Sequence, residues 1–428
     1  MVLPKKYLSL SPIDREEIGE KNIIFLGLWC LDKAELIEYK DTNLKIINYI
    51  SESEDEKKDA YEVVNKAYKK ILITLSSNLN SIHKTSRSLI FWEILVGYWL
   101  RQYLEVLYDR YRQLSYAHSL IPLATIKESN PEDYITPNDT DDFSTLVFTD
   151  FYNHQLISQI NNYKKIFPAE ILKVKRDIFL KDTLGRKKRN KFLIRLVTYA
   201  SSYLGKFNRV VFVKTYFSWT LLFRLGVALR SIPLLGVPAL KEKTIPISKI
   251  TRDLLRNADT DNFSNFEEMA FSLIQINLPK VFLERYQELT KLAKDLYPKR
   301  AKLFLTANAF ASNEVYKYWT GLVREKGSAE HIIIQHGANY GHSMIRSEED
   351  YEIHTSSKYL TSGWEMKGNK DVVPFIGSAF LGRIGDYRAT KTNFNPKGKT
   401  LWVLCSVPKY FYTQWSAPQG PMFIKYLD

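Results

Sequence analysis

Large apolar side chains recur every three or four positions between residues 61 and 115, a spacing typical of helices with one wide apolar face. We therefore predict helical structure over this stretch. The charged run that precedes it, 51–60, opens with serine and acidic residues, which suit the first turn of a helix. The helical spacing returns later in the chain, at 218–230, 262–297 and 312–327.

Short apolar runs that end at glycine, proline or polar residues predict buried strands. The first is NIIFLGLWC at 22–30, which places Trp29 near a strand end. A run of three isoleucines, 332–334, breaks abruptly into a Gln-His-Gly turn and is typical of a central strand in a parallel sheet. Further strands are predicted at 144–148, 209–213, 302–310 with its turn, 357–364, 372–378 and 401–408.

The alternation of strands and helices is clearest in the last third of the chain and predicts an α/β protein. A chain of 428 residues is too long for one ordinary core, so it forms two domains or one large domain with additions. We expect a Rossmann-like N-terminal domain at 1–390, with a helical insertion at about 51–200. Residues 391–428 are expected to be a linker and the start of a second Rossmann-like domain. One strand and a partial helix cannot bury their own core, so this second domain is expected to be truncated.

Composition narrows the class of protein. Hydrophobic residues make up 45% of the chain, which is typical of a globular fold. The two cysteines, Cys30 and Cys405, allow neither a disulfide framework nor a cysteine-based zinc site, which indicates a reducing compartment. The N-terminus lacks an apolar signal segment, and no run of about 18 uncharged apolar residues occurs. We therefore expect a cytoplasmic protein.

The net charge of +14 favours an anionic neighbour, which could be nucleic acid, anionic lipid or a phosphorylated substrate. The excess is concentrated at 164–195, where twelve Lys or Arg face three acids. One interpretation is attachment to an anionic membrane surface, to which each basic residue near the surface contributes about 1 kcal/mol. The other is an ordinary basic surface loop. The densest part of this stretch is Arg186, Lys187, Lys188 and Arg189.

The largest group of chemically useful side chains follows the isoleucine strand, in the sequence QHGANYGH. Ligands bind at the carboxyl ends of strands in open parallel sheets, and His336 falls at that edge. Gly337 permits the sharp turn and lets a ligand approach the backbone, and Gly341 precedes a second histidine, His342. An alternative is a strand end whose histidine is hydrogen-bonded into the core. We favour a functional site because two of only seven histidines flank one loop.

A second polar group consists of Asp150, Asn153 and His154, near the predicted start of a helix. These three residues, together with Trp29, are further candidates for substrate binding. The alternative interpretation is helix capping, because Asp and Asn are good N-terminal caps.

The order of motifs in the last third carries a family resemblance. It resembles the domain junction of GT-B transferases that build surface polymers, such as the CDP-glycerol glycerophosphotransferases and the capsule Kdo transferases. The first motif is a strand ending in His336-Gly337, and the second is a strand entering a Thr-Ser segment, with candidates at Thr355-Ser356-Ser357 and Thr361-Ser362-Gly363. The third is a strand ending in Phe375-Ile376-Gly377, and the last is a strand after a linker that runs into Val407-Pro408.

Nearly the whole chain also resembles a family of transferases from O-antigen and surface-carbohydrate gene clusters. The likeness is carried by FLGLWCLDKAE, FWEILVGYWL, FYNHQ, QHGANYGH and SVPKYFYTQWSAP. It implies a GT-B-like fold that moves a sugar or related group from a nucleotide-activated donor to a surface-polysaccharide or O-antigen acceptor, which is lipid-linked. It implies no cofactor beyond that donor and no metal. Members of such families continue through a complete second domain that holds most of the donor site, so a truncated chain is expected to be inactive by itself.

The loop residues take roles in such a reaction. His336 suits a general base for the acceptor hydroxyl, because the ordinary pKa of imidazole lies near neutrality. His342 would balance the charge of a donor pyrophosphate or an acceptor phosphate. Gln335 and Asn339 would hold sugar hydroxyls, and backbone amides around Gly337 would face phosphate oxygens. The basic stretch would hold the protein on the anionic inner face of the membrane, where lipid-linked acceptors lie.

Two other classes remain open. The basic charge and an aromatic content of 14% suggest a nucleic-acid-binding protein. No glycine-flanked aromatic RNA-binding motif, zinc pattern or clear helix-turn-helix occurs, so we do not favour nucleic acid as a partner. The third class is a non-catalytic, membrane-associated scaffold.

Overall fold

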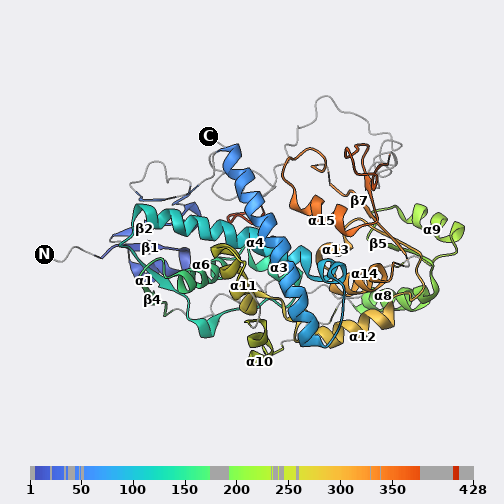
Figure 1. Ribbon diagram of the computed structural model, residues 1–428, viewed down its shortest axis with the longest axis horizontal. Coiled ribbons are helices and arrows are strands. Elements are labelled where there is room, and N and C mark those ends of the chain that lie inside the picture. Colours follow the sequence, from blue (N-terminus) through green and yellow to red (C-terminus); the bar gives the residue numbers. More distant parts are fainter. Residues whose placement is uncertain are drawn as a thin grey trace.

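The structure is a computed structural model (Figure 1). Two parallel sheets lie at its two ends, and long helices cross between them (Figure 1). This arrangement is consistent with two Rossmann-like domains. The structure describes residues 5–19, 22–32, 35–36, 44–47, 49, 53–173, 192–232, 234, 240, 245–256, 260–327, 329–337, 339–375 and 408–413, with the backbone alone for 192–197.

The first sheet has four strands, all parallel, in the order β2-β1-β3-β4. Strand β2 confirms the first half of the predicted strand at 22–30, but the chain then turns into a short 3-10 helix that contains Trp29. Strand β1 was not predicted, because three residues with a polar flank give no clear pattern. The strands are β1 (Tyr7–Ser9), β2 (Ile23–Phe25), β3 (Thr125–Glu128) and β4 (Ala169–Ile171).

The second sheet has five parallel strands in sequence order, β5-β6-β7-β8-β9. Strand β7, the isoleucine strand, lies in the middle, as the sequence predicts. Because all strands run the same way, their carboxyl ends share one edge, and His336 follows β7 at that edge. The strands are β5 (Val210–Val213), β6 (Leu303–Thr306), β7 (Glu330–Ile334), β8 (Lys358–Thr361) and β9 (Val372–Pro374).

Two long helices, α3 (Glu54–His83) and α4 (Leu89–Leu120), account for the helical pattern at 61–115. Lys84 ends α3 in a left-handed conformation, and the Ser88 side chain caps α4. Helix α4 is the central helix of the core, because it packs against α6 (Asp150–Lys164) near the first sheet and against α14 (Glu314–Glu325) and α15 (Ser347–Thr355) near the second. Its fully buried side chains include Trp92, Trp99 and Tyr103.

The remaining helices cover the two sheets and their connections. Within the described ranges, no helix is long and apolar enough to cross a membrane. These helices are α1 (Arg15–Ile18), α5 (Thr140–Leu146), α8 (Phe192–Leu204), α9 (Trp219–Ala228), α10 (Lys249–Asp253), α11 (Asn265–Asn277), α12 (Tyr286–Leu296) and α13 (Ala309–Ser312).

The predicted strand at 144–148 is wrong, because most of it lies in α5 and the following turn. The buried apolar residues there are Phe143, Leu146 and Val147, whose spacing of three and four is helical. The helix is also capped from a distant part of the chain, since the Thr140 amide donates to the Glu314 carboxylate at 3.0 Å. The Asp139 side chain also caps the helix locally, by accepting from the Asp142 amide at 2.8 Å. The local cap and the distant contact together favour a helix.

The predicted domain limits stay predictions. The segment 51–200, expected as a helical insertion, supplies two strands of the first sheet as well as helices. The expected boundary at 390 and nearly all of the strand expected at 401–408 lie outside the described residues. The division at 390 therefore stays a prediction.

Candidate functional site

Gln335 joins the ends of two strands at the edge of the second sheet. Its backbone amide donates to the Leu360 carbonyl at 2.8 Å, and its buried side-chain oxygen accepts from the Ser362 amide and the Trp364 indole, both at 2.8 Å. Its side-chain amide donates to the Gly337 carbonyl at 2.8 Å. These bonds occupy both ends of the Gln335 amide. Gln335 therefore positions the His336 loop, and its predicted contact with sugar hydroxyls stays a prediction.

His336 is oriented by a tyrosine that is itself held by a buried acid. The side chain of His336 is 23% exposed, and the Tyr340 hydroxyl lies 3.4 and 3.3 Å from its two ring nitrogens. The same hydroxyl donates to Oε1 of Glu352 at 2.7 Å. Because a tyrosine has one hydroxyl proton, its oxygen can only accept from an imidazole N–H. A neutral imidazole carries one N–H, so whichever ring nitrogen of His336 does not donate to this oxygen is unprotonated and can accept a proton.

The surroundings keep this group uncharged near neutral pH. Burial, and to a smaller extent the charge of Arg346, lowers the pKa of His336 to about 4, so the imidazole is neutral at pH 7. Burial raises the pKa of Glu352 well above its usual range. The guanidinium of Arg346 lies 3.5 Å from the centre of the Tyr340 ring, a cation–π contact that supplies the local positive charge.

Four other residues of the loop face solvent. Gly337, Asn339, Gly341 and His342 are exposed. Gly341 has a φ of 75°, and a Cβ at this position would lie 2.7 Å from the indole of Trp364. A glycine is therefore required here both by the backbone and by the close approach of the ring. The loop consequently presents the side chains of Asn339 and His342 outward beside the half-buried His336.

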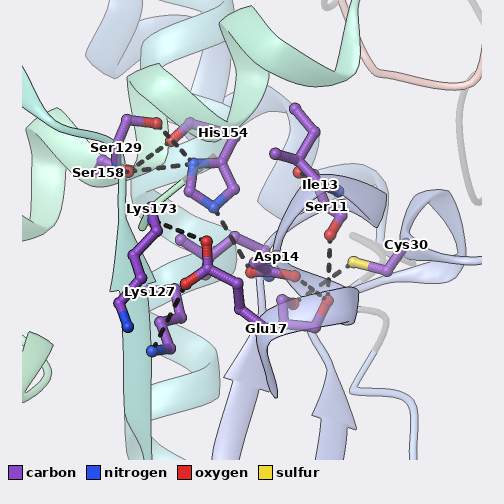
Figure 2. A network of polar contacts seen from close by, with 12 residues as sticks. Ser11, Ile13, Asp14, Glu17, Cys30, Lys127, Ser129, His154, Ser158 and Lys173 are labelled. Carbon is purple, nitrogen blue, oxygen red and sulfur yellow. Dashed lines mark hydrogen bonds and ion pairs between the residues drawn. The ribbon is translucent and has the colours of Figure 1, made fainter. Parts of the chain in front are cut away.

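His154, one member of the second predicted cluster, belongs to a buried polar network at the carboxyl ends of β1 and β3 (Figure 2). His154, on α6, shares a 2.8 Å hydrogen bond with the Ser129 hydroxyl, and its other nitrogen lies 3.5 Å from the Asp14 carboxylate. Asp14 in turn accepts 2.7 Å bonds from the Ser9 hydroxyl and the Leu10 amide. A Ser-His-Asp set is chemically suggestive. All three side chains are buried, and the network connects the ends of β1 and β3. The predicted contact of His154 with substrate stays a prediction.

Asn153 and Trp29 are also buried. The side-chain oxygen of Asn153 accepts from two nitrogens of the Arg110 guanidinium, at 2.9 and 2.7 Å. Its amide donates to the carbonyls that begin α6. The indole of Trp29 donates to the Leu10 carbonyl at 3.1 Å. The predicted contact of these residues with substrate stays a prediction, and each residue has a positioning role in the fold.

Asp150 is the partly exposed member of this cluster. Its carboxylate accepts from the Lys409 ammonium at 2.9 Å and from the Tyr410 hydroxyl at 2.6 Å. Arg110 also donates to the Phe411 carbonyl, at 2.8 Å. Residues 408–413 are therefore bound to the second cluster. This contact could not be predicted, because it joins positions about 260 residues apart.

Residues 408–413 also approach α15, the helix that carries Glu352. Tyr412 and Thr413 line a small cavity together with Tyr98 of α4 and Glu348 of α15. The carboxyl of Glu348 accepts from the Tyr98 hydroxyl at 2.8 Å, and the next turn of α15 carries Glu352. Residues 408–413 thus lie between the two predicted clusters.

Two further expectations concern anions and metals. Arg186, Lys187, Lys188 and Arg189 lie outside the described residues, so their membrane or anion contact stays a prediction. Over the parts of the chain that the structure describes, no group of three or more His, Cys, Asp or Glu side chains could hold a metal ion.

Comparison with known proteins gives one finding. A family model described as "LIC12162 family transferase" matches residues 6–428. No curated protein and no solved structure matches the chain. The expected likeness to CDP-glycerol and Kdo transferases therefore stays a prediction.

Proposed function

Since the chain belongs to the LIC12162 family of transferases, we propose that it moves a sugar or a related group from a nucleotide-activated donor to a surface-polysaccharide or O-antigen glycan. The family establishes that there is a donor and an acceptor. The two parallel sheets support a GT-B-like arrangement, in which the carboxyl edges of two sheets border one substrate site. The proposal places the His336 loop at that site.

The orientation of His336 carries the proposal. In the proposed step, the acceptor hydroxyl oxygen attacks the anomeric carbon of the donor sugar, and the bond from that carbon to the nucleotide phosphate oxygen breaks with its electron pair. The hydroxyl proton passes to the free ring nitrogen of His336. The Tyr340 oxygen accepts the N–H of the imidazole, and Glu352 fixes the Tyr340 hydroxyl by accepting its proton. They are positioning residues for this base.

Donor binding would strengthen the base. With a pKa of about 4, the imidazole of the free chain is a weak base at pH 7. A phosphate placed beside it favours the charged imidazolium and raises the pKa of His336 toward neutrality. Exposed His342 and Asn339 stand on the same loop, where they can contact the phosphate and sugar of the donor. The base would therefore gain strength only when the donor is in place.

The test uses the full chain with UDP-, GDP-, dTDP- and CMP-sugars. Binding is measured by calorimetry, and transfer to isolated surface glycans is measured as release of free nucleotide. We expect one donor class to bind and His336→Ala to lower kcat by about 10²–10⁴-fold with little change in donor affinity. His354→Gln, on the exposed end of α15, is the matched histidine control. Failure of every donor to bind would refute a nucleotide-sugar transferase, and unchanged turnover in His336→Ala would exclude His336 as the base.

A further inference from the structure

Helix α9 carries apolar side chains on two opposite sides. On the inner side, Leu222 and Leu225 pack on a small cluster that Phe212, Leu305 and Ile334 form on one face of the second sheet. An amphipathic helix of a globular domain needs one such apolar face. This packing does not require apolar residues on the outer side of α9.

The outer side of α9 is nevertheless apolar. Trp219, Phe223 and Val227 follow one another at intervals of four residues and so line one side of the helix. They are 67%, 70% and 66% exposed. A single exposed apolar side chain is ordinary, but a contiguous row is the mark of an interaction surface.

The exposed apolar surface continues beyond the end of the helix. Asn208 and Ile232 exchange two hydrogen bonds, of 2.8 and 3.0 Å, which hold the end of this segment beside the turn that carries Phe207. Phe207 is 90% exposed and Ile232 is 42% exposed. We refer to these residues together as the α9 surface: Phe207, Trp219, Phe223, Val227 and Ile232.

The segment that carries the α9 surface has no negative charge of its own. Residues 183–241 contain twelve Lys or Arg and no Asp or Glu. Arg209, Arg224 and Arg230 are exposed in its described part. An apolar row with one exposed arginine on the same helix, further exposed arginines beside it and no acids is the composition of helices that lie in the interface of anionic bilayers.

We propose that the α9 surface docks on an anionic lipid bilayer, with Trp219, Phe223 and Val227 in the interfacial region and Arg224 and Arg230 on the lipid phosphates. Nucleic acid offers phosphates but no apolar layer for Val227 and Phe223, so it fits this surface less well. A helix of ten residues is about 15 Å long, half the thickness of a bilayer core. The helix therefore lies along the membrane and does not span it.

This docking identifies the class of acceptor. Helix α9 packs on Ile334, the last residue of β7, and the next residues of the chain are Gln335 and His336. A bilayer on the outer side of α9 would thus be separated only by that helix from the sheet whose carboxyl edge carries the candidate base. The arrangement fits an acceptor anchored in the membrane by a lipid. The acceptor class rests on the proposed function, whereas the docking itself does not.

The first test is sedimentation of the full chain with vesicles. We expect binding to vesicles that contain phosphatidylglycerol and weak binding to pure phosphatidylcholine, since the arginines need an anionic surface. The double variant Trp219→Ser/Phe223→Ser should lose at least about tenfold in vesicle affinity, because each ring contributes apolar area. Leu123→Ser/Ile73→Ser, at exposed apolar positions on other elements, is the matched control and should bind as the unmodified chain does.

The charge is tested by Arg224→Gln/Arg230→Asn, since Asn tolerates the left-handed backbone of Arg230. This variant should weaken binding to anionic vesicles and leave the low binding to neutral vesicles unchanged. Circular dichroism confirms that each variant folds. The proposal is overturned if the unmodified chain ignores anionic vesicles or if the Trp219/Phe223 variant binds them normally. It is equally overturned if the surface mediates self-association or DNA binding and not vesicle binding.

Failure of the docking can be separated from failure of the proposed function. Transfer to a water-soluble glycan acceptor does not need a membrane, so it should survive the Trp219→Ser/Phe223→Ser change. Transfer to a lipid-linked acceptor in vesicles should fall with vesicle affinity. Vesicle binding without any sugar transfer would refute the proposed function and leave the docking standing.

Discussion

The Tyr340 hydroxyl donates a hydrogen bond of 2.7 Å to Oε1 of Glu352, at a place where neither residue is more than 1% exposed. Burial is the main reason that the pKa of Glu352 lies well above its usual range, which favours the protonated acid. The hydroxyl proton is committed to this bond, so the tyrosine oxygen faces His336 as an acceptor. The pair therefore orients the candidate base, and either ring nitrogen lies close enough to donate to the tyrosine oxygen.

Replacing Tyr340 by phenylalanine tests this positioning role. Tyr340→Phe removes the acceptor for the imidazole N–H and should lower kcat about tenfold, with KM nearly unchanged. The matched control is Tyr98→Phe, which removes a similar bond to Glu348 on the same helix without touching His336. An equal loss of kcat in both variants would mean that losing a hydrogen bond to α15 lowers activity in general. It would contradict a specific effect of Tyr340 on His336.

The protonation of Glu352 has a consequence for stability. A carboxyl whose pKa is raised by folding keeps its proton in the folded chain while the unfolded chain loses it above about pH 4.5, so folding becomes less favourable as pH rises. Glu352→Gln keeps an acceptor for Tyr340 and removes this ionisation. The stability of the variant relative to the unmodified chain should therefore increase from pH 5 to pH 8. Urea unfolding at pH 5 and at pH 8 measures this difference.

Glu365→Gln, at an exposed position, is the control for that comparison and should show no such pH-dependent gain. A stability difference for Glu352→Gln that is the same at both pH values would mean that Glu352 is ionised in the folded chain.

The pKa of His336 can be observed directly. In the free chain, its ring signals should titrate with a midpoint of about 4, measured by nuclear magnetic resonance with labelled histidine and assigned by His336→Ala. The midpoint should rise toward neutrality when a nucleoside diphosphate is added, because an adjacent anion stabilises the imidazolium. A midpoint near 6.5 in the free chain would contradict the burial of this ring.

The turn at Gly341 can be tested with a second glycine as reference. Gly341→Ala forces a side chain into a φ of 75° and against the Trp364 ring, whereas Gly327→Ala meets the same kind of backbone, with a φ of 60°, and no atom within 4 Å. Gly327→Ala should cost about 1 kcal/mol of unfolding free energy and Gly341→Ala clearly more, as measured by denaturant unfolding. Equal costs would show that the Trp364 ring moves aside easily.

The buried Asn153–Arg110 pair is expected to be structural. Asn153→Ala removes two hydrogen bonds to a buried arginine and leaves its Nε without an acceptor, whereas Nη2 keeps the Phe411 carbonyl, so stability should fall by about 1–3 kcal/mol. Asn162→Ala, exposed on the same helix, should change stability little. Thermal unfolding measures both. If the Asn153→Ala variant is stable but binds the donor or the acceptor more weakly, the result would support the predicted contact of Asn153 with substrate.

The sequence by itself determined the elements whose patterns are strong and local. Three isoleucines bounded by a Gln-His-Gly turn identify β7 as a central parallel strand, and this alone places His336 at a carboxyl edge. The spacing of Trp92, Trp99 and Tyr103 likewise identifies α4 as a buried helix. Such patterns are readable because period and burial are set by residues that are near neighbours in the chain.

Tertiary structure alone decided what the side chains at those places do. Gln335 is a clamp because Ser362 and Trp364 meet it, and His154 is buried because Ser129 and Asp14 surround it. No local pattern records these partners, since they lie between 25 and 140 positions away or on another strand. The pKa of His336 also depends on tertiary structure, because burial and the charge of Arg346 lower it from the ordinary value of an imidazole. Chemistry depends on such distant contacts, whereas secondary structure depends mainly on neighbours.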